Sequence, residues 1–390
     1  MHISEPVRCS SPSSGADAAK RGVSRLGLLI LKVLHPAAEG CGACRLRLPD
    51  IPERRGETGA EPAPDFPVDV VYTWVDGSDP AHAAKRARYL SDQKDIHPDG
   101  LELARYRENE ELRYSLRSLE TFAPWVRRVI ILTDNQVPAW LDVSHPKIRI
   151  ADHKECIPER FLPTFNAQVI EAYLHRIPDL SEHFIYFNDD VMLGRPCRQT
   201  DFFTPNGLPI TLVDWRWRRR FGYWYTKTPH ACSYYNTLAL LKQKGVSSNP
   251  LFVSAHGPYA QTRGNVAAAY EFFHDFIENF SGNRFRGTNE IGMYSHATPL
   301  LMYPRKRVIP SDQRYFYVQT KRWDRAAYYR GIVRSQNDAA PPFFFCINDV
   351  GSDTGTAWHN DLLSLMEAYF PVPCSFERTL PGESGYWSSK

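Results

Sequence analysis

The chain has 390 residues, of which 43% are hydrophobic and 23% charged, and its formal net charge is +3. This is an ordinary globular balance, and it lacks the strong basic field of a nucleic-acid-binding protein, so we expect no nucleic-acid partner. Aromatic residues make up 13% of the chain. Such rings can stack on sugars, although in a large domain most of them fill the core.

Residues 1–66 are predicted to be an N-terminal extension, and residues 67–390 a catalytic domain. The extension contains a Ser/Gly/Ala-rich stretch, the short apolar segment 26–34 and a Pro/Glu/Arg-rich linker at 49–67. Segment 26–34 is shorter than the ~18 residues of a membrane span and contains Lys32. It could form a poor signal peptide, a peripheral membrane helix or an ordinary packed helix. We expect no export, and therefore a cytoplasmic protein that could associate with the inner face of the membrane.

The eight cysteines are scattered along the chain. A chain of this length does not need disulfides for stability. Only Cys41 and Cys44 lie close together, and they lack the further ligands that a structural zinc site requires. A reducing compartment is the simpler interpretation.

Continuous apolar segments predict buried strands at 68–75, 128–133 and 183–187. Between them, apolar residues at helical spacing predict helices at 108–122 and 166–177. Fully apolar strands that alternate with helices are typical of a parallel sheet covered on both faces. The sequence therefore predicts an α/β protein with a mostly parallel sheet.

Acidic residues follow each of these strands: Asp76, Asp134, and the adjacent pair Asp189 and Asp190. In open parallel sheets, ligands bind outside the carboxyl ends of the strands. Two adjacent carboxylates repel each other unless a cation lies between them, and oxygen ligands suit Mg²⁺ or Mn²⁺. The alternative is that one Asp caps a turn while the other faces solvent. No GxGxxG or GxxxxGK[ST] pattern supports a dinucleotide or P-loop site.

Beyond residue 201 the chain forms an aromatic-rich region with several basic residues. The loop 254–264 carries His256, which could serve as a general base. Arg286 could bind a phosphate in a bidentate way, but Arg284 and the basic run 215–220 are equally plausible from charge alone.

A helix-like stretch covers 266–280, and a short apolar strand at 343–347 ends in Asn348 and Asp349. A last helix is expected at 361–370.

Four sequence blocks occur in a fixed order: DVVYTWVDGSDP at 69–80, a long segment at 105–194, the HGP loop at 256–258 and FCIND at 345–349. Together they resemble the Stealth family of sugar-phosphate transferases. The resemblance implies a modified Rossmann-like fold of the GT-A type. It also implies transfer of hexose-1-phosphate, in some members N-acetylglucosamine-1-phosphate, from a nucleotide-sugar donor to a hydroxyl of a polysaccharide or glycan acceptor. The product would be a phosphodiester of capsule or exopolysaccharide synthesis, with release of a nucleoside monophosphate.

The resemblance also implies roles for individual residues. His256, Asp189, Asp190 and Arg286 match the catalytic positions, with Mg²⁺ or Mn²⁺ at the two adjacent carboxylates. The matched substrate-binding positions are Asp76, Glu171, Asn348 and Asp349. We expect His256 to deprotonate the acceptor hydroxyl, while Arg286 and the cation hold the diphosphate.

Two other functions are alternatives. A metal-dependent glycosyltransferase would use the same carboxylates but release a nucleoside diphosphate. A non-catalytic carbohydrate-binding protein would use the aromatic surplus and would have no need for carboxylates aligned at strand ends.

Overall fold

The computed structural model describes residues 64–90, 96–214, 228–247, 253–311, 314–320, 325–350 and 356–378, all of which belong to one compact unit. Most of the predicted extension, the two close cysteines and the basic run 215–220 lie outside these residues. Within the described part of the chain, every helix is too short or too polar to cross a membrane.

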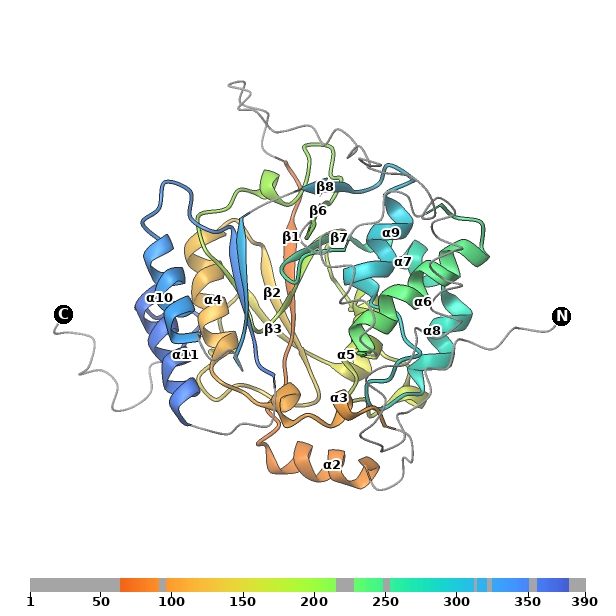
Figure 1. The fold of residues 1–390 in the computed structure, drawn as a ribbon, viewed down its shortest axis with the longest axis horizontal. Helices are drawn as coiled ribbons and strands as arrows, with labels where there is room; N and C mark the ends of the chain where they lie inside the picture. Colours follow the sequence, from red (N-terminus) through yellow and green to blue (C-terminus); the bar gives the residue numbers. More distant parts are fainter. Residues whose placement is uncertain are drawn as a thin grey trace, which may run out of the picture. The chain divides into compact units, whose positions relative to one another are not determined.

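A five-stranded sheet in the order β3–β2–β1–β4–β7 forms the centre of the fold (Figure 1). Its strands are β1 (Val68–Thr73), β2 (Arg128–Thr133), β3 (Ile148–Asp152), β4 (His183–Asn188) and β7 (Tyr259–Thr262). Strands β1 to β4 pair in parallel, and β7 pairs antiparallel with β4. The predicted mostly parallel sheet is confirmed.

The central strands are mostly apolar because both faces of the sheet are covered; the buried Asp69 of β1 is an exception and is paired with Arg127. In β4, Phe184 and Tyr186 belong to one buried cluster, whereas Ile185 and Phe187 belong to another. Side chains alternate between the faces of a strand, so a strand buried on both sides shows no polar alternation.

Helices cover both faces of the sheet (Figure 1). The sheet face on which Tyr186 lies is covered by α5 (Ala167–Tyr173), α6 (Pro229–Gln243), α7 (Arg263–Phe272), α8 (His274–Ser281) and α9 (Thr298–Met302). The face of Phe187 is covered by α4 (Glu111–Phe122) and by a smaller sheet. That sheet consists of β5 (Val191–Leu193), β10 (Phe344–Asn348) and β9 (Tyr315–Gln319), in this order.

The remaining elements pack around this frame. Helices α10 (Arg325–Ser335) and α11 (Thr356–Tyr369) contribute to a third apolar cluster with β9 and β10. Helices α2 (Pro80–Leu90) and α3 (Pro98–Leu101) follow β1, and β6 (Ile210–Leu212) pairs in parallel with β8 (Ile309–Ser311).

Several elements differ from the prediction; among them, β7 lies within the stretch 254–264 that was predicted to be a loop. Strand β3 was not predicted, because its sequence IRIAD is short and mixes charged with apolar residues, as a strand at the edge of a sheet can. The helix-like stretch 266–280 is two helices joined at Phe273, which ends α7 and precedes α8. Phe273 is buried at the joint, so the bend keeps an apolar side chain in the core.

The topology brings distant segments to one edge of the large sheet. The parallel strands β1, β2 and β4 all end there, and the antiparallel β7 begins there. After Asp190 the chain continues into β5, which pairs antiparallel with β10, so that Val191 lies opposite Cys346. The end of β10 therefore lies beside Asp190.

Candidate active site

A cavity of about 250 Å³ lies at the carboxyl ends of β1 and β4. Seven of the eight predicted site residues line it: Glu171, Asp189, Asp190, His256, Arg286, Asn348 and Asp349. Asp134, which follows β2, lines it as well. The structure thus brings together residues from all four blocks, since Thr73, Trp74 and Val75 of the first block also line the cavity.

Asp76 is the predicted site residue that does not line this cavity. Its Oδ1 accepts hydrogen bonds from the Ser78 backbone N–H, at 2.8 Å, and from the Ser78 hydroxyl, at 2.6 Å. Its backbone N–H and carbonyl are both bonded to the Gln136 amide. In this structure, Asp76 stabilises the turn after β1, as Asp commonly does at turns, and its contact with substrate stays a prediction.

The Asp190 carboxylate is oriented by β10. Its Oδ2 lies 3.3 Å from the Asn348 amide nitrogen and 3.3 Å from the Cys346 sulfur, both of which can donate to it. Its backbone carbonyl accepts from the Ile347 N–H at 3.0 Å. The other oxygen, Oδ1, is buried and has no hydrogen-bond partner in the part of the chain that the structure describes. A buried anionic oxygen without a partner is costly unless a ligand or cation contacts it.

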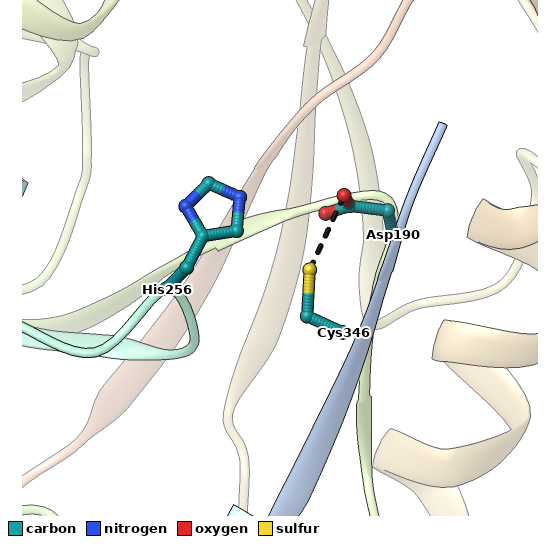
Figure 2. Close-up of side chains that lie close together, drawn as sticks. All are labelled: Asp190, His256 and Cys346. Carbon is teal, nitrogen blue, oxygen red and sulfur yellow. Dashed lines mark hydrogen bonds between the residues drawn. The ribbon is translucent and has the colours of Figure 1, made fainter. Parts of the chain in front are cut away.

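The residues around Asp190 can accommodate a cation. Ligand atoms of Asp190, His256 and Cys346 all lie within 4.8 Å of one another (Figure 2). Burial and the charge of Asp190 raise the pKa of Cys346 well above its usual range, so the thiol stays protonated and acts as a donor. Among these three side chains, Asp190 therefore offers the best ligand for a hard cation such as Mg²⁺, through its Oδ1.

Asp189 lies next to this cluster but is not part of it. Burial, and next the charge of Asp190, raise the pKa of Asp189 to about 8. A cation beside the two carboxylates would counter both effects and favour the ionised form of Asp189.

His256 lies just before β7 and is held in its neutral form. Burial lowers its pKa, and Arg286 acts in the same direction, while the charge of Asp190 opposes them. Its Nε2 lies 3.4 Å from the Asn188 amide nitrogen, and its ring meets Tyr317 edge to face at 5.6 Å between centroids. A neutral imidazole inside a cavity can accept a proton from a hydroxyl group.

Two arginines give the cavity a cationic wall. Arg286 lines it and makes no ion pair with any described residue. Arg105 lines it too; burial, and next the positive charge of Arg286, lower the pKa of Arg105 to about 10, so it remains charged at neutral pH. Arg284 is turned away: it donates to the Pro163 carbonyl, and its guanidinium lies 4.4 Å from the centre of the Tyr89 ring. The structure thus places Arg286 at the cavity and Arg284 away from it, a distinction that charge alone could not make.

Asp349 is paired within the wall of the cavity. It accepts from Arg107 Nη1 at 2.8 Å and from the Thr320 hydroxyl at 2.8 Å. The second terminal nitrogen of Arg107 is buried and has no hydrogen-bond partner within the described ranges.

Sequence reasoning missed several lining residues: Arg105, Arg107, Glu111 and His230. Arg105 and Arg107 belong to the charged run before α4, and Glu111 is the first residue of that helix; such a run alone resembles a solvated surface. Their position within the longest family block was the signal that could have singled them out.

Comparison with protein families gives two matches. The region described as Stealth protein CR1, conserved region 1, matches residues 66–93, and Stealth protein CR2, conserved region 2, matches residues 105–211. The capsular polysaccharide phosphotransferase fcs1 of Haemophilus influenzae is 34% identical over 306 residues, which cover 78% of this chain and 84% of that protein. A capsular polysaccharide phosphotransferase of Neisseria meningitidis serogroup B is 36% identical, covering 79% and 84%.

This chain belongs to the Stealth family. The resemblance predicted from the four blocks is confirmed. An exopolysaccharide phosphotransferase of Streptomyces coelicolor is 39% identical over 316 residues, and there the Stealth chain covers 53% of the relative's length. Among solved structures, the galactosyltransferase LgtC in complex with donor and acceptor sugar analogs is 14% identical, with a TM-score of 0.41 over 81% of this Stealth chain and 98% of that one.

Proposed function

We propose that this Stealth protein is a capsule or exopolysaccharide phosphotransferase that moves hexose-1-phosphate from a nucleotide sugar to a hydroxyl of a glycan. The names of its relatives support the reaction class. The observation that carries the proposal is a neutral histidine, His256, in the same cavity as two charged arginines, Arg105 and Arg286. Phosphoryl transfer needs a base for the acceptor and positive charge for the phosphates, and little else from the protein.

In the proposed reaction, the acceptor oxygen attacks the β-phosphorus of the nucleotide sugar. His256 takes the proton of the attacking hydroxyl as the new oxygen–phosphorus bond forms. The bond between the β-phosphorus and the oxygen that bridges it to the α-phosphate breaks, and the nucleoside monophosphate leaves with that oxygen. The sugar stays bonded to its phosphate, so the product is a phosphodiester.

The arginines supply fixed positive charge for the diphosphate. Arg286 carries no ion pair within the described residues and can therefore direct its guanidinium to phosphate oxygens. Arg105 is anchored through Asp99, whose backbone carbonyl accepts from its Nε. Guanidinium groups held in place before the reaction stabilise developing charge without reorganisation.

A divalent cation fits the acidic side of the cavity. Asp190 would hold it through its partnerless Oδ1, with Asp189 beside it. When bound, Mg²⁺ or Mn²⁺ would neutralise charge on the donor diphosphate.

The decisive experiment is incubation of the purified protein with a panel of nucleotide sugars and a glycan acceptor, with Mg²⁺ or with a chelator. We expect release of nucleoside monophosphate, a phosphodiester signal in phosphorus NMR, and loss of turnover in the chelator that added Mg²⁺ restores. Release of nucleoside diphosphate would instead identify a glycosyltransferase. Glycan binding without turnover of any nucleotide sugar would identify a carbohydrate-binding protein.

The role of His256 is tested in the same assay. His256→Ala should lower kcat by on the order of 10²–10⁴, the usual contribution of a general base. His274→Ala is the matched control, because His274 lies on the exposed start of α8 and does not line the cavity. Near-normal turnover of the His256 variant would refute the assignment.

The same proposal places the catalytic domain at 67–390 and a peripheral membrane anchor, if there is one, in segment 26–34. A variant that lacks residues 1–66 should keep its turnover. Unchanged recovery of that variant with membranes would dismiss the anchor.

A further inference from the structure

A chain of buried polar side chains runs from α5 through β4 to His256. The Tyr186 hydroxyl lies 3.3 Å from Glu171 Oε1 and 2.7 Å from Asn188 Oδ1. The Asn188 amide nitrogen lies 3.4 Å from His256 Nε2. The chain thus links Glu171, in the helix that precedes β4, to the proposed base.

The surroundings of this chain make its hydrogen bonds directional. Tyr186 is fully buried among aromatic rings, and its hydroxyl has one proton to donate. It donates to Asn188 Oδ1, which can only accept, and its own oxygen can accept from the Thr73 hydroxyl at 3.0 Å. This arrangement directs the Asn188 N–H at His256 Nε2, which must then carry its lone pair.

We infer that Glu171, Tyr186 and Asn188 are positioning residues that hold His256 in the tautomer and orientation needed to take the acceptor proton. This inference rests on the proposed role of His256 as the base. It assigns Glu171 a role through Tyr186, in place of the direct substrate contact expected from the sequence.

The same hydrogen-bonded side chains can also accommodate the proton that His256 receives during the reaction. Once Nε2 carries a proton, it can donate to the Asn188 amide oxygen if the amide turns over. The amide nitrogen then donates to the Tyr186 oxygen, and the Tyr186 hydroxyl donates to Glu171. Glu171 thus receives the Tyr186 hydrogen only in the second state, in which the charge on His256 is highest, and no proton leaves the chain. An apolar residue at position 186 would remove the central hydroxyl, and the hydrogen bonds could then not reverse direction.

Tyr294 provides a matched control for Tyr186. Its ring lies 4.8 Å from the Tyr186 ring, in the same buried cluster, and both side chains are fully buried. The Tyr294 hydroxyl, however, has no hydrogen-bond partner among the described residues. Tyr294→Phe and Tyr186→Phe therefore remove the same atom from neighbouring sites, and only the second removes a link of the chain.

The test measures donor and acceptor kinetics of Tyr186→Phe, Tyr294→Phe, His256→Ala and the double variant Tyr186→Phe/His256→Ala, with melting temperatures for all. We expect Tyr186→Phe to lower kcat about 10- to 100-fold with the donor KM unchanged, as supporting residues of active sites commonly do. Tyr294→Phe should leave kcat unchanged. Because Tyr186 acts through His256, the double variant should be no slower than His256→Ala alone.

The outcomes separate the two proposals. If His256→Ala turns over normally, the base assignment fails, and the chain fails with it. If His256→Ala is slow while Tyr186→Phe matches Tyr294→Phe, His256 remains the base, but the positioning role of Glu171, Tyr186 and Asn188 is wrong. If Tyr186→Phe slows wild type and His256→Ala by the same factor, its role is general packing, and the chain is again overturned.

Discussion

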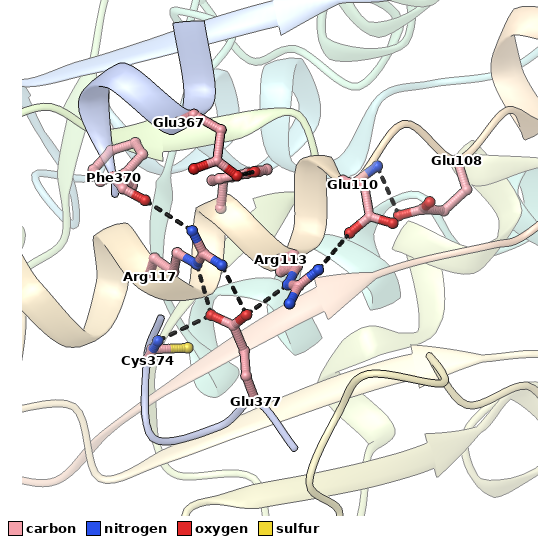
Figure 3. Close-up of polar contacts among 9 residues, drawn as sticks. Glu108, Glu110, Arg113, Arg117, Glu367, Phe370, Cys374 and Glu377 are labelled. Carbon is pink, nitrogen blue, oxygen red and sulfur yellow. Dashed lines mark hydrogen bonds and ion pairs between the residues drawn. The ribbon is translucent and has the colours of Figure 1, made fainter. Parts of the chain in front are cut away.

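Arg117 of α4 and Glu377 of the segment 371–378 form a bidentate ion pair in the interior of the protein (Figure 3). Arg117 Nε lies 2.6 Å from Glu377 Oε1, and one terminal nitrogen lies 2.9 Å from Oε2. The side chains are 2% and 3% exposed. Arg113 and the Cys374 backbone N–H also donate to the same carboxylate. The pair fastens the end of the described chain to the helix that covers the sheet.

Glu377→Ala should destabilise the protein strongly, because it leaves the Arg117 charge buried without its carboxylate. Loss of one partner of a buried pair costs about 3–5 kcal/mol. The control is Asp338→Ala, since Asp338 pairs with Arg314 where both side chains are 46% exposed; that change should cost less than about 1 kcal/mol. Urea unfolding of both variants measures the difference. Equal losses in the two variants would contradict the structural role of the buried pair.

Glu290 makes the stability of the protein depend on pH. It is fully buried, and burial raises its pKa from 4.5 to about 7 despite bonds from Asn166, Asn283 and the Gly287 N–H. Because the folded pKa is the higher one, its contribution is fully present below pH 4.5 and is lost as the pH rises through about 7. Glu290→Gln should remove this part of the loss, of the order of 3 kcal/mol. Unfolding free energies at pH 5 and pH 7.5 test this, and an unchanged pH slope in the variant would refute it.

The sequence predicted the strands that carry the site better than it predicted the residues that line the cavity. The apolar runs that became β1, β2 and β4 carry a strong local signal, because strands buried on both faces are mostly apolar. The carboxylates at their ends could therefore be placed at one edge of the sheet from the sequence alone. Asp76 has the same local pattern but caps a turn, and only three-dimensional contacts distinguish the two roles.

Residues that reach the cavity through tertiary packing gave no such signal. Arg105 lies in a short helical turn before α4, and its proximity to Arg286 depends on how two distant segments fold together. Cys346 was predicted to lie in a short strand and in the fourth block, but only the antiparallel pairing of β10 with β5 places it beside Asp190.

Arg105→Gln and Arg286→Gln should each weaken donor binding. A hydrogen bond to a charged group contributes about 1.5–3 kcal/mol, so we expect the donor KM to rise roughly 10- to 100-fold. Arg284→Gln is the control, because its guanidinium is bound to the Pro163 carbonyl and does not line the cavity. Steady-state kinetics with varied donor test the difference. A donor KM that rises equally in the Arg284 variant would show that the effect is structural.

Asn348→Ala should weaken the response to Mg²⁺. Asn348 and Cys346 both hold Asp190 Oδ2, and this leaves Oδ1 directed away from β10 for the proposed cation. Loss of a residue that orients a metal ligand typically costs 10–100-fold in metal affinity. The Mg²⁺ concentration for half-maximal turnover should rise by about that factor, while saturating Mg²⁺ restores much of the rate. Asn206→Ala, in an exposed turn, should leave it unchanged. An Asn348 variant with reduced turnover at every Mg²⁺ concentration and an unchanged midpoint would show that Asn348 serves the substrate and not the cation.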